Sequence, residues 1–151
     1  MQLFIGGACA GKRDTVAARF PEAAWHRAGQ GGALSAWRDR LATGRPLVIT
    51  GWGDWLAVAL IEEADDDRLR GRLADELAAM GEAERQTGGE VVLILPEMGR
   101  GIVPLAAADR RLRDLAGWLA QDAAAQAEAV WYVRHGLVRC LSRINPAGDS
   151  R

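Results

Sequence analysis

The sequence predicts an α/β fold in which a mostly parallel sheet has helices on both faces and a C-terminal strand pair. Short apolar runs alternate with helical patterns along the 151 residues, and this alternation is typical of parallel sheets. Residues 90–95 form a nearly continuous β-branched, apolar run, as expected of a central strand buried on both faces. Residues 1–5 form another apolar run, which leads directly into a glycine-rich turn. We expect residues 1–144 to be a single domain and residues 145–151 a flexible polar tail.

The glycine-rich turn, Gly-Gly-Ala-Cys-Ala-Gly-Lys-Arg at residues 6–13, has the G-x-x-x-x-G-K spacing of a phosphate-binding loop. Such a loop needs glycine because its backbone N–H groups turn inward and approach phosphate oxygens closely, which a Cβ would obstruct. The helix that follows directs further N–H groups and a partial positive charge at the same phosphates. The sequence therefore predicts a nucleotide site formed by Gly6, Gly7, Ala8, Cys9, Ala10, Gly11, Lys12, Arg13 and Asp14.

Lys12 is the only lysine of the chain, which otherwise uses arginine at its strongly basic positions. A slim point charge at this position, in place of the bulkier planar guanidinium, favours a functional loop over a chance match to a short motif. We predict that Lys12 is catalytic and reaches the terminal phosphates of the nucleotide. The next position, where a Ser or Thr hydroxyl would hold Mg²⁺, is Arg13, so Mg²⁺ binding is doubtful.

The first half of the chain contains short elements. Phe20 precedes Pro21, and a residue before proline resists the helical conformation, so a helix should end there. An apolar repeat at helical spacing and a compact apolar run come later in this half. The expected elements are a helix at residues 14–19, a strand at 22–26, a helix at 33–42 and a strand at 46–50.

The second half repeats the alternation with longer elements. Asp54 is expected to cap the first helix, and Gly136 is expected to separate two strands of a hairpin. Carboxylates at residues 62–67 flank helix starts, which favours a solvated junction over a metal site. The expected elements are helices at residues 54–61, 68–80 and 105–127 and strands at 90–95, 129–133 and 137–141.

The carboxyl ends of parallel strands are where ligands bind in open α/β sheets. Glu97 follows the strand at residues 90–95 and is our second candidate catalytic residue, although an exposed loop position is an equally good interpretation. At the end of the strand at residues 46–50, Thr50 stands where an aspartate would be expected. Asp54 is one helical turn further on and is better explained as a helix cap.

Several other polar or aromatic residues admit both functional and structural interpretations. His26 ends a strand at the ligand edge and is included among the nucleotide-binding candidates, while His135 is expected in an exposed turn. The tryptophans at positions 52 and 55 are candidates for core packing or for base stacking, with core packing favoured for Trp55. Phosphate contacts or surface ion pairs are the alternatives for Arg100, Arg110, Arg111 and Arg113.

The overall composition excludes several classes of protein. A net charge of −1 provides no global attraction to nucleic acid or to a membrane surface. Cys9 and Cys140 lack metal-ligand spacing and are expected to be free thiols. No apolar run approaches the roughly 20 residues that a membrane span requires, and no signal-peptide pattern is evident, so we expect a cytoplasmic protein.

The stretch from Pro96 to Pro104, Pro-Glu-Met-Gly-Arg-Gly-Ile-Val-Pro, resembles a bacterial family of cobalamin biosynthesis. This is the adenosylcobinamide kinase/adenosylcobinamide-phosphate guanylyltransferase family, which has N-E-x-G-x-G-I-V-P here. Residues 111–117 resemble the R-D-x-x-G helix of that family, and residues 6–12 resemble its G-G-A-R-S-G-K loop. The resemblance implies a P-loop NTPase-like (RecA-like) fold, GTP or ATP as donor, a corrinoid acceptor and a homo-oligomer, with a trimer as one such state.

The family phosphorylates the aminopropanol arm of adenosylcobinamide and then transfers GMP through a guanylylated histidine. This chain departs from the family pattern at Arg13, Thr50, Pro96 and Ala120, where the family has Ser, Asp, Asn and Asn. The R-H-R-x-x-R-P-x-x-W segment that carries the histidine is missing between His26 and Leu34, and that role is not transferred to His26. The resemblance therefore implies a kinase without guanylyltransferase activity, or an impaired nucleotide- or corrinoid-binding relative.

Overall fold

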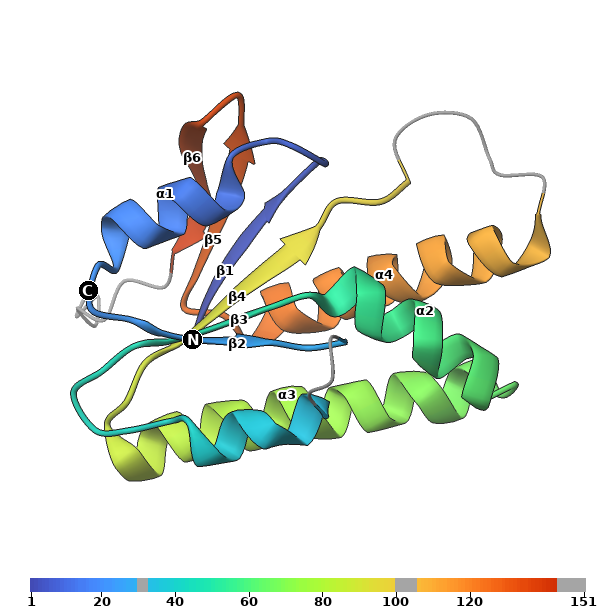
Figure 1. Cartoon of the computed structure of the whole chain (residues 1–151), viewed down its shortest axis with the longest axis horizontal. Coiled ribbons are helices and arrows are strands. Elements are labelled where there is room, and N and C mark those ends of the chain that lie inside the picture. The colour runs from blue at the N-terminus through green and yellow to red at the C-terminus, as the bar shows by residue number, and fades with distance from the viewer. Residues whose placement is uncertain (30–32, 100–105, 144–151) are drawn as a thin grey trace, which may run out of the picture.

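The computed structural model describes residues 1–29, 33–99 and 106–143, which form one α/β unit (Figure 1). The elements alternate much as the sequence predicts. In chain order they are β1 (Gln2–Gly6), α1 (Lys12–Arg19), β2 (Ala24–Arg27), the 3₁₀ helix η1 (Leu34–Asp39), β3 (Leu47–Thr50), α2 (Trp52–Glu62), α3 (Asp66–Thr87), β4 (Val91–Pro96), α4 (Ala107–Gln126), β5 (Ala129–Arg134) and β6 (Leu137–Arg143).

The strands form a single sheet in the order β2-β3-β4-β1-β5-β6. β1 is parallel to both of its neighbours, β4 and β5, while β6 pairs antiparallel with β5. The predicted mostly parallel sheet and the C-terminal strand pair are therefore confirmed. β4 separates β1 from β3, as in RecA-like P-loop folds, and the carboxyl ends of these three strands meet at one edge of the sheet.

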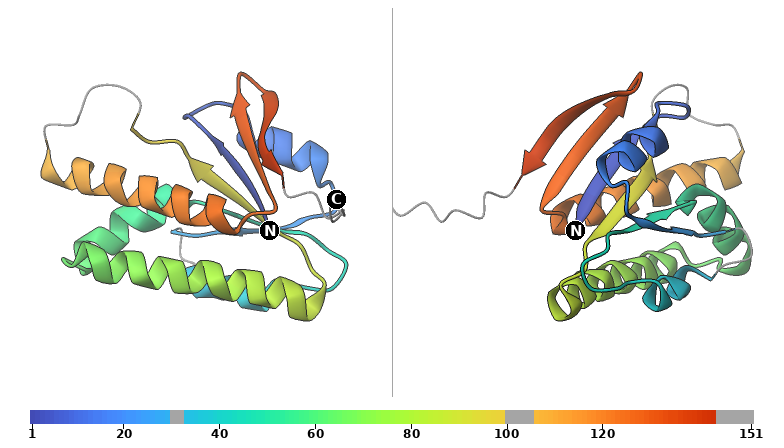
Figure 2. Two further views of the ribbon diagram at one scale, coloured as in Figure 1. Left: turned by 180° about the vertical axis from the view of Figure 1, so that it is seen from behind. Right: turned by 60° about the vertical axis from the view of Figure 1, so that its left-hand side comes forward.

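Helices cover the two faces unequally (Figure 2). On one face, α2, α3 and α4 pack over a large core that includes Leu3, Ile49 and Leu93. On the other face, α1 packs over a smaller core around Phe4 and Val48. Successive residues of β1 point to opposite faces, so Leu3 and Phe4 join the two cores from adjacent positions.

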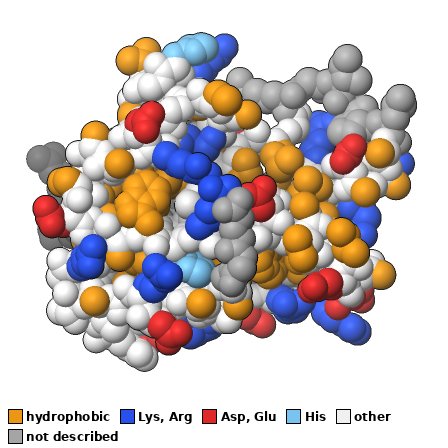
Figure 3. All heavy atoms as spheres, viewed as in Figure 1, with side chains coloured by type: hydrophobic (Ala, Val, Ile, Leu, Met, Phe, Trp, Pro, Cys, Tyr) orange, Lys and Arg blue, Asp and Glu red, His pale blue; other side chains and the backbone are white. Residues whose placement is uncertain are grey.

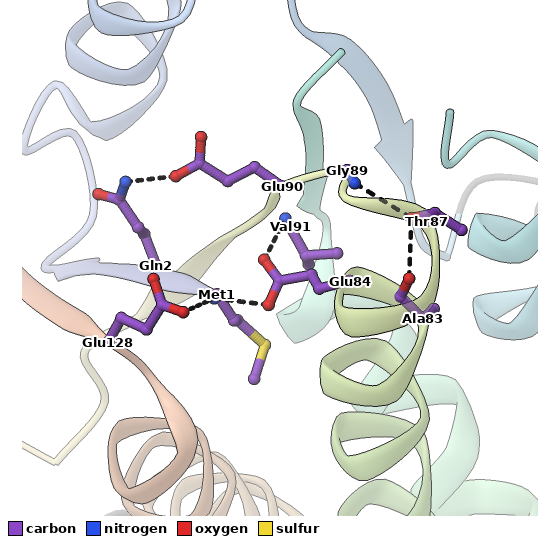
Figure 4. Close-up of polar contacts among 9 residues, drawn as sticks. All are labelled: Met1, Gln2, Ala83, Glu84, Thr87, Gly89, Glu90, Val91 and Glu128. Carbon is purple, nitrogen blue, oxygen red and sulfur yellow. Dashed lines mark hydrogen bonds and ion pairs between the residues drawn. The ribbon is translucent and has the colours of Figure 1, made fainter. Parts of the chain in front are cut away.

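A polar network fastens the amino ends of the central strands, at the edge remote from the glycine loop (Figure 4). Glu84 of α3 accepts hydrogen bonds from the Met1 amine at 2.6 Å and from the Val91 N–H at 2.7 Å. The side chains of Gln2 and Glu90 are also hydrogen-bonded. Because β1 and β4 are anchored at this end, the residues at their other ends are held in a fixed register.

Several predicted helix boundaries, and the type of one helix, differ from the structure. Residues 33–42 were expected to form an α-helix, but the segment is the shorter 3₁₀ helix η1. Asp54 does not cap α2, because the helix begins two residues earlier and Gly51 occupies the cap position. α3 continues past the predicted end at Met80 to Thr87, because tertiary packing of Ala83 offsets the modest helix cost of Gly81.

The expectations for cysteines and membrane spans can be compared with the described residues. Cys9 and Cys140 are both exposed and free, as predicted. Among residues 1–29, 33–99 and 106–143, no helix combines the length and apolar character needed to cross a bilayer. The predicted tail at residues 145–151 and the resemblance-bearing residues 100–105 lie outside the described residues.

Candidate functional site

The glycine loop connects the carboxyl end of β1 to the amino end of α1. Gly11 precedes the helix with a φ of 88°, in the left-handed region that side chains disfavour. An added Cβ there would also lie 3.2 Å from the Gly136 Cα. The tight turn that the sequence predicts is thus present, and glycine is required at its last position before the lysine.

The loop rests on the β5–β6 hairpin. The Gly136 N–H donates to the Ala10 carbonyl at 2.9 Å, which joins the hairpin turn to the loop. At the start of the loop, a Cβ on Gly6 would lie 2.2 Å from the Val133 carbonyl oxygen, so only glycine fits there without displacement of the backbone. The C-terminal strand pair therefore supports the shape of the loop.

Lys12 begins α1, and its ammonium group lies over the loop backbone. Nζ donates to the carbonyl of Gly6 at 2.8 Å and to that of Gly7 at 2.6 Å. Burial lowers the pKa of Lys12 and the nearby Arg13 lowers it further, whereas Cys9 and Glu97 raise it. Two hydrogen bonds hold the lysine against the loop, and the third N–H donor of the ammonium group remains for a phosphate oxygen.

A cavity of about 500 Å³ opens between the loop and the turn that joins β3 to α2. Its size is within the usual range of small-molecule sites. Figure 3 shows Lys and Arg side chains gathered between α1 and α2 on the face toward the viewer. The lining residues are Cys9, Ala10, Gly11, Lys12, Arg13, Asp14, Thr50, Gly51, Trp52, Gly53, Asp54, Ile94 and Pro96.

The opposite wall of the cavity is the β3–α2 turn. Gly51 has a φ of 82°, and a Cβ there would lie 2.2 Å from the Ala28 carbonyl oxygen. Asp54, in the first turn of α2, forms an ion pair with Arg27 at 3.1 Å. Arg27 is the last residue of β2, so this ion pair links the end of β2 to the start of α2. The Asp54 carboxylate therefore has a structural partner.

Glu97 follows β4 and is bonded to the start of the loop, but it does not line the cavity. Its N–H donates to the Gly6 carbonyl at 2.8 Å, and its carboxylate accepts from the Tyr132 hydroxyl at 2.8 Å. Tyr132 belongs to β5, so its side chain spans the end of β1 to reach Glu97. Lys12 Nζ also donates to the Gly6 carbonyl, so the two predicted catalytic residues meet at the same loop oxygen.

His26 does not join the cavity. Its ring is only 4% exposed and lies 3.2 Å from the Ala33 carbonyl, and it pairs in register with the buried Ile49. Burial lowers the pKa of His26, and the Ala33 carbonyl opposes this effect. These contacts favour a structural role over the predicted nucleotide contact.

The burial of His26 predicts a loss of stability in acid. The unfolded chain takes up a proton near the ordinary pKa of 6.5, whereas the folded protein does so only at lower pH. Stability is therefore full above pH 6.5 and declines below it, by at most about 1.4 kcal/mol per pH unit. We expect His26→Gln, which stays neutral, to lose less stability than the parent between pH 7 and pH 5 in urea denaturation. Equal losses in both proteins would contradict this assignment.

The structure brings together some of the predicted residues and disperses others. Residues 9–14 line the cavity, while Gly6, Gly7 and Ala8 form the adjoining turn. Arg111 instead bonds to Asp66 and to carbonyls at the C-terminal end of α2, and Arg113 donates to the Gly99 carbonyl. Sequence reasoning missed Tyr132 and Arg27, because their partners are set by strand order and no local motif marks them.

The two positions that hold Mg²⁺ in phosphate loops carry side chains other than the expected hydroxyl and carboxylate. Arg13 follows the lysine where a hydroxyl is expected, and Thr50 ends β3 where a carboxylate is expected. Throughout residues 1–29, 33–99 and 106–143, no group of three or more His, Cys, Asp or Glu side chains is arranged to hold a metal ion. Positions 13 and 50 therefore lack the hydroxyl–carboxylate pair that holds the usual Mg²⁺ of this fold.

A glycine loop between a central parallel strand and a helix, with a lysine at its end, defines the phosphate-binding-loop class of α/β proteins. The family model of cobinamide kinase / cobinamide phosphate guanyltransferase (CobU) matches residues 16–141. This chain belongs to the CobU family. The matched region begins just after the loop, so the loop assignment rests on its own sequence and geometry.

Curated relatives support the same family. The bifunctional adenosylcobalamin biosynthesis protein CobP of Pseudomonas aeruginosa is 36% identical over 100 residues, which cover 66% of this chain and 55% of that protein. The bifunctional protein CobU of Salmonella typhimurium is 36% identical over 76 residues, covering 50% of this chain and 42% of CobU. The Escherichia coli CobU is 34% identical over a region of the same size. The chain thus spans about half the length of the curated relatives it matches.

Proposed function

We propose that this chain binds GTP or ATP in the loop cavity and acts as an adenosylcobinamide kinase. The proposal depends mainly on the position of Lys12. This residue begins α1 directly after the glycine loop and lines the cavity, in a member of the CobU family. Phosphoryl transfer depends mainly on positioning and on charge stabilisation, for which the loop N–H groups and Lys12 are suited.

In the proposed reaction, the hydroxyl of the aminopropanol arm attacks the γ-phosphorus, and the bond to the β-phosphate oxygen breaks. The nucleoside diphosphate leaves, and the hydroxyl proton passes to a base. Glu97 is our candidate base, since it is bonded to the start of the loop near Lys12. Lys12 offsets the charge on the transferred phosphoryl group.

We propose that guanylyl transfer is absent. The family segment that carries the guanylylated histidine has no counterpart between His26 and Leu34. His26 itself is buried against the Ala33 carbonyl, in a position that does not face the cavity. As a second candidate, Arg13 and Thr50 favour a protein that binds nucleotide, or a corrinoid, with little turnover.

The test is an assay of purified protein with γ-labelled GTP or ATP and adenosylcobinamide, followed by chromatography of the corrinoid. Labelled adenosylcobinamide phosphate is expected, and adenosylcobinamide-GDP is not. Nucleotide binding by calorimetry without any labelled product would replace the kinase with the second candidate. Absence of both binding and product would overturn both proposals. Gel filtration with light scattering tests the predicted homo-oligomer.

Tyr132 is expected to position Glu97, and this role can be separated from nucleotide binding. Tyr132→Phe removes the hydroxyl that donates to Glu97 at 2.8 Å and leaves the ring in place. A misplaced base lowers turnover, so we expect kcat to fall about tenfold and nucleotide affinity to change less than about twofold. Glu97→Gln, which removes the base, should lower kcat by about 10²-fold or more. A Tyr132→Phe enzyme with parental kcat would rule out the positioning role.

A further inference from the structure

The loop cavity has exchanged its expected metal-binding groups for a different set of charges. In phosphate loops, Mg²⁺ lies between a hydroxyl of the loop and an aspartate at a strand end. Arg13 and Thr50 occupy these positions, and both line the same cavity. The two substitutions thus affect the same part of the site from opposite walls.

The exchange conserves charge. A divalent cation beside one aspartate contributes a net charge of plus one to the site, and an arginine beside a threonine contributes the same. Loss of the loop hydroxyl alone would weaken metal binding and leave the aspartate to repel phosphate. With Arg13 and Thr50, the site lacks both the Mg²⁺-binding hydroxyl and the strand-end aspartate. The Arg13 guanidinium then supplies the positive charge that Mg²⁺ would provide.

Lys12 and Arg13 line the cavity, and neither forms an ion pair among the described residues. The charge of Arg13 lowers the pKa of the adjacent Lys12. Of the carboxylates that line the cavity, Asp54 is paired with Arg27, and Asp14 lies in the first turn of α1 without an ion pair among the described residues. Glu97 and Cys9 act on Lys12 in the opposite direction to Arg13. Asp14 offsets part of the charge, and the two neighbouring cations remain available to an anionic ligand in the cavity.

Thr50 presents a hydroxyl group to the cavity. Its side chain is 7% exposed, lines the cavity, and makes no hydrogen bond within the described part of the chain. Among the described residues no buried side-chain oxygen or nitrogen lacks a partner, so the Thr50 hydroxyl is open to the cavity. Unlike a carboxylate, a hydroxyl can donate to a phosphate oxygen. A phosphate bound here would satisfy it.

We propose that this cavity binds the phosphates of GTP or ATP without a divalent cation, with Arg13 in place of the metal charge and Thr50 as a neutral hydrogen-bond donor. The proposal rests on the nucleotide site of the proposed function. Arginine suits the task because its guanidinium forms bidentate, charge-assisted hydrogen bonds with phosphate. It also stabilises the transition-state charge in other phosphoryl transfers.

The experiment is calorimetric titration of the full chain with GTP and with ATP, in excess Mg²⁺ and in excess EDTA. The dissociation constants in the two conditions should agree within about threefold. In EDTA, Arg13→Ser should weaken binding by about 10- to 30-fold, the loss expected of a charge-assisted contact. Arg13→Lys should retain part of the affinity. The matched control is Arg139→Ser, which removes the same charge from the exposed strand β6.

The outcomes separate this inference from the proposed function. Binding of the parent protein in Mg²⁺ but not in EDTA would overturn the inference and leave the nucleotide site intact. Parental affinity of Arg13→Ser in EDTA would also overturn it. No binding of either nucleotide under either condition would overturn the nucleotide site itself. The double variant Arg13→Ser/Thr50→Asp should bind more tightly in Mg²⁺ than in EDTA, because it restores both metal-binding side chains.

Discussion

Replacement of Lys12 by alanine is expected to weaken the binding of GTP or ATP by about 10²- to 10³-fold and to abolish measurable phosphoryl transfer. The ammonium group is half-buried and lies over the loop on the Gly6 and Gly7 carbonyls, at 2.8 and 2.6 Å. An ammonium group has three N–H donors, so it can also donate to phosphate oxygens. Its loss removes about two charge-assisted hydrogen bonds from the bound state.

The same substitution should change the free energy of unfolding by less than about 1 kcal/mol, because it also removes a partly desolvated charge beside Arg13. Lys12→Arg tests shape at constant charge, and the bulkier planar fork should not restore affinity. Titration calorimetry measures binding, and urea denaturation confirms that the variants fold. Nucleotide affinity of Lys12→Ala within threefold of the parent would show that the lysine has no part in the site.

The fold was predictable because its signals are local. Residues 90–95 show the apolar run of a central strand, and β4 occupies nearly the same residues. The alternation of strands with helical segments predicted a parallel sheet, and β1 to β5 are parallel. Short amphipathic segments are less informative. Leu34 and Trp37 are three residues apart, which suits a 3₁₀ helix as well as an α-helix, so the spacing alone could not distinguish them.

The loop was also predictable, because one continuous segment carries the whole motif. The contacts around it were not, because they depend on strand order and on the direction of each side chain. Tyr132 reaches Glu97 only because β1 lies between β4 and β5. His26 was expected at the ligand edge, but its register with Ile49 directs it into the larger core. Neither fact follows from the neighbours of these residues in the sequence.

Gly51→Ala is expected to destabilise the protein by about 3 kcal/mol or more. Gly51 has a φ of 82°, a left-handed conformation that costs a residue with a Cβ about 1–2 kcal/mol. The added Cβ would also lie 2.2 Å from the Ala28 carbonyl oxygen and 2.9 Å from the Arg27 Cγ. A carbon atom cannot lie this close to a backbone oxygen, so the chain at the end of β2 must move away from α2. For a chain of this size, a loss of about 3 kcal/mol lowers Tm by about 6–12 °C.

Gly53→Ala is the matched control, because Gly53 lies two residues further on, in the first turn of α2. Gly53 lies inside α2, and its added Cβ would meet only the Pro96 Cγ at 3.8 Å, an ordinary contact. Alanine is the better helix former, so this variant should be stabilised by about 0.5–1 kcal/mol. Chemical denaturation of both variants gives the comparison directly. Equal stabilities of Gly51→Ala and Gly53→Ala would contradict the close packing of the β3–α2 turn against the end of β2. They would also contradict the position of the cavity wall that this turn forms, including Thr50.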